Sequence, residues 1–71
     1  MKTLDHATAM AQMAIDILYS EGNPFKEPID KSRLQWEIRQ ATLKKLVMED
    51  SDILDEEEFQ ECVNNSKIKN S

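Results

Sequence analysis

The sequence predicts an all-α protein with three helices. Two observations support this prediction: no segment alternates apolar and polar residues with the period of a strand, and a single glycine is available for tight turns. Apolar residues instead recur at helical spacing in about residues 4–21, 31–49 and 55–64. We expect one helical domain over residues 1–64, followed by a flexible polar tail over residues 65–71.

The first helix is expected to begin near Thr3 or Asp5, because either side chain can cap exposed backbone N–H groups. It should end at Gly22, and two prolines then keep the connection out of helical conformation. We interpret its broad apolar side as the core face, which comprises Leu4, Ala7, Met10, Ala11, Ala14, Ile17 and Leu18. The flexible side chains of Met10 and Met13 leave an adaptable binding surface as the alternative.

The second helix carries apolar residues on two sides, and either Asp30 or Ser32 can cap its start. One side holds Leu34, Ile38, Ala41 and Met48, and the nearly opposite side holds Trp36, Leu43 and Val47, with Leu46 towards it. The other two helices could cover both sides. The competing hypothesis leaves one side for another protein, because tryptophan beside arginine is a composition that often dominates binding energy. The candidate partner-binding residues on that side are Trp36, Arg39, Leu43 and Val47.

The third helix is predicted to begin in the acidic segment SDILDEEEFQECV, residues 51–63. Asp55 is the expected N-cap, and Glu58 has the spacing of a capping box. Glu56 and Glu57 lie in the first turn, where the helix dipole favours carboxylates. Phe59, Cys62 and Val63 then form a short apolar face.

The charges are unevenly distributed along the chain. Eight acids and no base occupy residues 49–61, whereas six bases and three acids occupy residues 26–45. Since a helix start needs only one or two acids, we treat part of this excess as a candidate docking surface that selects a basic target by complementary charge. The candidate residues are Asp52, Asp55, Glu56 and Glu57.

An alternative hypothesis is that the acids imitate a phosphate backbone and occupy the basic groove of a DNA- or RNA-binding protein. Direct binding to nucleic acid is not expected of a chain with a net charge of −5.

Catalysis is not expected, because the sequence has no phosphate-binding loop or dinucleotide motif. Its one histidine, His6, and its one cysteine, Cys62, fall in different helices, which argues against a transition-metal site. An EF-hand loop counted from Asp50 would use Asp52, but Asp55 stands where that loop requires glycine. We therefore expect no catalytic residue, no cofactor, no metal and no small-molecule substrate.

A cytoplasmic protein is expected from two further features. One cysteine cannot form an intramolecular disulfide. The N-terminal segment also lacks the uninterrupted apolar run of a signal peptide or a membrane span, so no membrane partner is expected.

The leading functional hypothesis is a small non-enzymatic inhibitor, adaptor or regulatory subunit. It would bind a larger protein, or a second copy of itself as a homodimer, through the helical surface around Trp36. The residues SEGNPFKEP resemble, over a short stretch, the turn that follows a helix in antitoxins of the ribbon-helix-helix kind. The segment MKTLDHATA does not resemble the DNA-reading strand of that family, so we assign no family. The resemblance implies toxin neutralisation as one instance of the inhibitor hypothesis.

Overall fold

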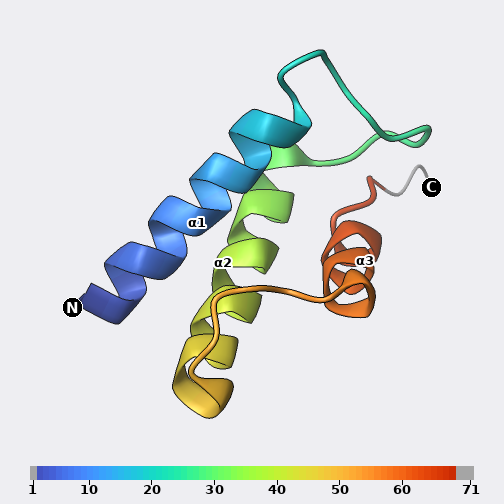
Figure 1. Ribbon diagram of the computed structural model, residues 1–71. Coiled ribbons are helices and arrows are strands. Elements are labelled where there is room, and N and C mark those ends of the chain that lie inside the picture. The colour runs from blue at the N-terminus through green and yellow to red at the C-terminus, as the bar shows by residue number, and fades with distance from the viewer. Residues whose placement is uncertain (1, 69–71) are drawn as a thin grey trace.

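The described part of the chain folds into three helices, which confirms the all-α prediction. The structure is a computed structural model that describes residues 2–68, with helices α1 (Lys2–Leu18), α2 (Lys31–Glu49) and α3 (Glu56–Asn65) (Figure 1). Helix α2 runs back alongside α1 and also packs against α3. Within residues 2–68, α1 and α3 do not pack directly against each other as helices, so α2 is the central element.

The first helix is shifted relative to its predicted bounds. It begins at Lys2, so neither Thr3 nor Asp5 is its N-cap. Its early end has a local cause: the Ser20 hydroxyl donates to the Ile17 carbonyl at 2.9 Å, and such a side-chain bond competes with a further helical turn.

Gly22 closes the turn that follows α1. Its N–H donates to the Tyr19 carbonyl at 3.1 Å, and its φ is +100°. This conformation suits glycine because it has no Cβ to clash with the backbone. The sequence therefore located the turn correctly but placed the last helical residue too late.

The buried stripe of α1 is rotated from the predicted core face. Every fourth residue is buried, namely Ala7, Ala11 and Ile15. Ile17, which was assigned to the core, is 71% exposed, and Ile15 takes its place. The small alanines let α2 approach closely, and this approach determines which stripe is covered.

The bounds of α2 agree with the prediction. Asp30 is the N-cap, and its carboxylate accepts the Arg33 N–H at 3.1 Å. The helix ends at Asp50, which adopts a left-handed φ of 53°. Met48 was placed on the same apolar side as Leu34 and Ile38, but it is exposed, because the last turn of α2 extends past α3 (Figure 1).

The predicted capping box at the start of α3 is confirmed. The Asp55 carboxylate accepts the Glu58 N–H at 2.8 Å, and the Glu58 carboxylate accepts the Asp55 N–H at 3.0 Å. Both bonds satisfy backbone groups at the helix start that have no partner within the helix.

The residues after α3 pair with the connection that leads into α2. The Ser66 carbonyl accepts the Asp30 N–H at 2.8 Å, and the Ile68 N–H donates to the Pro28 carbonyl at 3.0 Å. Ser66 is also buried, with its hydroxyl donating to the Cys62 carbonyl at 2.7 Å. Ser66 and Ile68 of the predicted tail therefore contact the rest of the chain, and residues 69–71 lie outside the described residues.

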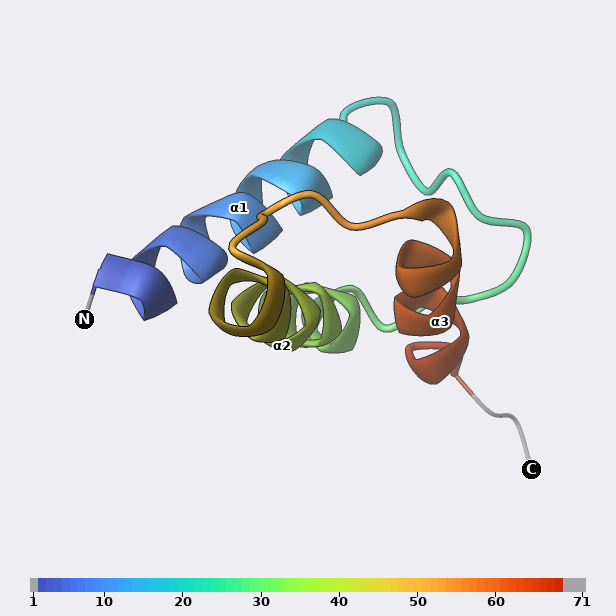
Figure 2. The same ribbon diagram turned by 60° about the horizontal axis from the view of Figure 1, so that its bottom comes forward.

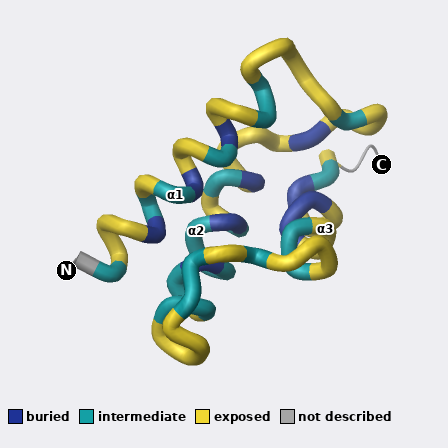
Figure 3. The backbone as a smooth tube through the Cα atoms, in the orientation of Figure 1, coloured by how far each residue is buried: buried dark blue, intermediate teal, exposed yellow. Residues whose placement is uncertain are grey.

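The core is a single small cluster between the three helices (Figure 3). It comprises Ala11, Ile15, Ile29, Leu34, Ile38, Cys62 and Val63. Thr42 extends the buried stripe of α2 and is only 1% exposed.

Candidate interaction surfaces

The side of α2 that carries Trp36 faces away from α3. Lys45 marks the α3 side, because its ammonium group pairs with the Glu58 carboxylate of α3. Trp36 precedes Lys45 by nine residues, or about two and a half helical turns, which places it on the opposite side of α2. Trp36 is 47% exposed and Val47 is 72% exposed.

An arginine holds the exposed indole ring. The Arg33 guanidinium lies over the Trp36 ring, with its carbon 4.8 Å from the ring centroid, in the geometry of a cation–π contact. Arg33 also pairs with Glu37 at 2.9 Å. Arg39 was predicted from the sequence as the partner-binding arginine and Arg33 was not, although both are three residues from Trp36.

Two of the predicted partner-binding residues are less accessible than expected. Leu43 and Arg39 are both half-buried. The Arg39 Nε is inaccessible to solvent and has no hydrogen-bond partner among the described residues. Of the four predicted residues on this side of α2, Trp36 and Val47 are therefore the most exposed.

Helix α1 also carries exposed apolar residues. Ile15 belongs to the core cluster that includes Cys62 and Val63 of α3. Met13 and Ile17 are each two residues from Ile15 and so lie on the opposite flank of α1. Both are exposed and face away from the core. We call the side of α2 that carries Trp36, Leu43 and Val47 the Trp36 face.

The predicted acidic docking residues lie elsewhere. Asp52 pairs with the Nε2 of His6 at 2.8 Å, and the connection that carries it lies next to α1 (Figure 2). Asp55 caps α3 and lies 4.0 Å from the Lys45 Nζ. Glu56 and Glu57 are exposed in the first turn of α3. Because α3 packs on the Lys45 side of α2, these acids and the Trp36 face form two separate surfaces.

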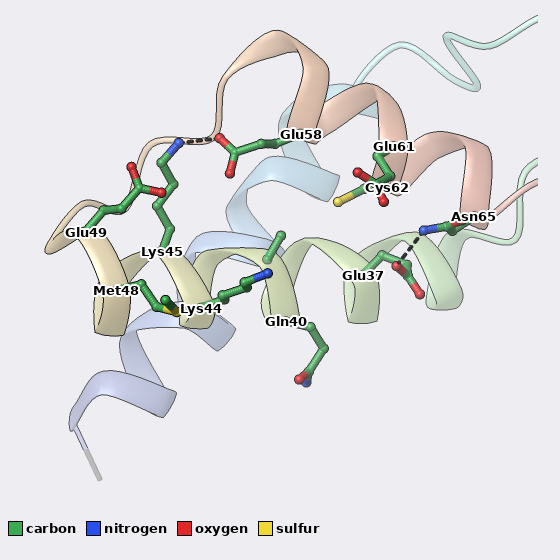
Figure 4. A pocket seen from close by; sticks show the side chains of 11 residues that line it. Glu37, Gln40, Lys44, Lys45, Met48, Glu49, Glu58, Glu61, Cys62 and Asn65 are labelled. Carbon is green, nitrogen blue, oxygen red and sulfur yellow. Dashed lines mark hydrogen bonds and ion pairs between the residues drawn. The ribbon is translucent and has the colours of Figure 1, made fainter.

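A groove between α2 and α3, which the sequence did not predict, has a volume of about 470 Å³ (Figure 4). The Cys62 sulfur points into the space between the helices, and Ala41 and Met48 of α2 also line the groove. Polar contacts close its two ends. The Lys45–Glu58 pair lies at one end, and at the other the Asn65 side-chain amide donates to Glu37 at 3.3 Å.

Hydrogen bonds, burial and nearby charges shift the pKa values of three groups around the groove. The hydrogen bond to Glu58 raises the pKa of Lys45. The pKa of Glu58 is lowered, first by the Asp55 N–H and then by Lys45. Burial raises the pKa of the Cys62 thiol to about 11, and the nearby carboxylates of Glu37 and Glu61 add to this rise. Cys62 is therefore a neutral thiol at pH 7, which does not suit a nucleophile.

The described residues show neither a metal-binding cluster nor a membrane-spanning helix. In residues 2–68, no three histidine, cysteine, aspartate or glutamate side chains converge in a way that could hold a metal ion. None of the three helices within that range is sufficiently long and apolar to cross a bilayer.

Comparisons with protein-family models, curated proteins and solved structures find no match for this chain. The described residues form two candidate binding surfaces, the Trp36 face and the groove between α2 and α3.

Proposed function

We propose that this chain is a non-enzymatic interaction protein that binds a larger protein through the Trp36 face. The observation that carries the proposal is a half-exposed tryptophan in contact with Arg33, with the exposed Val47 on the same side of α2. Tryptophan and arginine are enriched among the residues that contribute most to binding energy in protein interfaces.

The arrangement of the face supports binding more strongly than its composition alone. Single exposed apolar residues are common on soluble proteins, whereas apolar residues gathered on one side favour association. Covering them would remove apolar surface from water, which is favourable by about 25 cal/mol per Å². The Arg33 contact also restricts the Trp36 ring before binding, which reduces the entropy lost on association.

The nucleic-acid mimic hypothesis has less support. Asp52 is paired with His6, and Asp55 is engaged by a backbone N–H and lies near Lys45. Carboxylates already engaged within the chain offer less free charge to a basic groove. The antitoxin hypothesis is one instance of the proposed inhibitor function, and no contact in the structure favours it over other instances.

Affinity capture from a native lysate tests the proposal. The tagged chain, its Trp36→Ala variant and its Gln60→Ala variant would be used as baits, with captured proteins identified by mass spectrometry. Gln60 is an exposed residue of α3 and serves as the matched control. We expect a specific partner to be lost with Trp36→Ala and retained with Gln60→Ala, provided that both variants keep the helical circular dichroism of the parent.

Sizing of the purified chain completes the test, because the partner can be a second copy. In that case the parent and Gln60→Ala elute as dimers and Trp36→Ala elutes as a monomer. A monomeric parent whose captured proteins are the same with all three baits would contradict the proposal.

A further inference from the structure

We propose that the groove between α2 and α3 is a second binding site, which takes a basic amphipathic segment of a partner protein. Apolar side chains of the segment would enter the groove, and its lysine or arginine side chains would lie against the acidic rim. This inference goes beyond the Trp36 face and would make the chain an adaptor with two separate binding surfaces.

The size and floor of the groove suit a few apolar side chains. Its volume of about 470 Å³ falls within the usual range of ligand pockets in proteins. Ala41 and Met48 of α2 and Cys62 of α3 provide its apolar surface. The Cys62 side chain adds to this surface as a neutral thiol, since free cysteine behaves as a small hydrophobe.

The rim of the groove has an excess of acid. Four glutamates and two lysines line it: Glu37, Glu49, Glu58, Glu61, Lys44 and Lys45. Lys45 is neutralised by Glu58, and Glu37 pairs with Arg33. Glu49 and Glu61 form no ion pair with any other described residue, and Lys44 is the one lining base in the same condition. The free charge on the rim is therefore negative and complementary to a basic partner.

Burial is the main cause of the raised pKa of the Cys62 thiol, and the carboxylates of Glu37 and Glu61 add to the rise. An anionic ligand would meet the same unfavourable field as the thiolate. A cation held at the rim would instead be favoured.

The groove is held open by contacts within the chain. The Lys45–Glu58 pair and the hydrogen bond from Asn65 to Glu37 join α2 to α3 at its two ends (Figure 4). A segment can thus bind between helices that are already in place, which reduces the ordering cost of association. Recognition of an amphipathic helix in such a groove is a common mode of peptide binding.

The test is an NMR titration of the ¹⁵N-labelled chain with a short amphipathic peptide of leucine and lysine, blocked at both ends. The control peptide has glutamate in place of every lysine. We expect saturable shifts of the amides of Ala41, Lys44, Met48, Glu61 and Cys62 with the lysine peptide alone. The Trp36 indole signal should stay unchanged. Shifts centred on the Trp36 indole, equal binding of both peptides, or no saturable shift would overturn the proposal.

Charge variants of the rim sharpen the test. Glu61→Lys should weaken binding of the lysine peptide about five-fold, through lost attraction and added repulsion. Glu21→Lys makes the same charge change at an exposed residue that does not line the groove, and it should leave binding nearly unchanged. Equal weakening by both variants would show a general charge effect and would overturn the assignment of the groove.

The Trp36→Ala variant separates this inference from the proposed function. It should bind the lysine peptide as the parent does, because Trp36 lies on the opposite side of α2. Retained peptide binding together with unchanged lysate capture would contradict the Trp36 face alone. Lost capture without any saturable peptide binding would contradict the groove alone.

Discussion

The two sides of α2 have similar apolar content but different surroundings. Leu34 and Ile38 are buried against the other helices, whereas Trp36 and Val47 remain exposed. The rest of the chain provides two helices, and both pack against α2 in a way that leaves the Trp36 side open. An apolar pattern therefore indicates how many sides of a helix favour burial, but not which of those sides the other helices of the same chain cover.

The largest effect is expected from shortening a buried side chain on the covered side of α2. Leu34→Ala should lower the free energy of unfolding by about 2–5 kcal/mol, because it removes a fully buried side chain and leaves a cavity. Val47→Ala, the matched change on the open side, should alter it by no more than about 0.5 kcal/mol. Urea unfolding followed by circular dichroism measures both, and similar losses would contradict the assignment of the two sides.

A chemical probe should also distinguish the covered side. With a pKa of about 11 in place of the ordinary 9.0, Cys62 has about one hundredth of the usual thiolate fraction in mild alkali. A thiol reagent should therefore react with the native chain at least about a hundred-fold more slowly than with the chain in urea. Equal rates in the two states would show that Cys62 is not buried between α2 and α3.

The raised pKa of Cys62 also determines whether the free energy of unfolding rises or falls as the pH becomes alkaline. The unfolded thiol ionises first as the pH rises above 9.0, so the folded chain retains its proton longer. Stability from this group is therefore present below that pH and is lost between about pH 9 and 11. A Cys62→Ala variant should not show this part of the alkaline loss in pH-dependent urea unfolding.

A smaller effect is expected at the start of α3, the helix that covers one flank of α2. Asp55→Ala removes the acceptor for the Glu58 N–H and should lower the unfolding free energy by about 1 kcal/mol. Asp55→Asn retains a capping oxygen and should lose much less. Thermal melts of the two variants would test this difference, and equal melting temperatures would count against the cap.

The weakest expected effect is the acid dependence that comes from Glu58. Its pKa is lowered in the folded chain by the Asp55 N–H and by Lys45, so the ionised form stabilises the fold. This contribution is present above the ordinary Glu58 pKa of 4.5 and is lost as the pH falls through the lowered value. Glu58→Gln should flatten the acid part of the stability curve, and a curve parallel to that of the parent would contradict this role.

Local signals predicted α3 more accurately than α1. The cap at Asp55 and its reciprocal bond with Glu58 involve residues only three apart, so their spacing in the sequence was sufficient to locate the helix start. The core face of α1 depends on where α2 crosses it, and the pattern could not distinguish Ile15 from Ile17 as the buried residue. The sequence therefore predicted correctly that α1 forms, but wrongly how α1 is rotated about its axis.

The candidate surfaces were predicted only in part. Trp36 and Val47 are exposed on the second side of α2, as the hypothesis of an open side required, but the contact of Arg33 with Trp36 appeared only in the structure. The groove had no sequence signal. Its lining residues come from two consecutive helices, and their facing positions depend on how α3 docks against α2.

The sequence by itself determined three helices, the turn at Gly22 and the cap at Asp55, and it limited the cap of α2 to Asp30 or Ser32, because each depends on neighbouring residues. Tertiary structure alone decided which apolar sides were covered, the separation of the acids from Trp36, and the groove beside Cys62. These outcomes depend on the packing of α2 between its neighbours, and contacts between distant residues are not encoded in any single stretch of the chain.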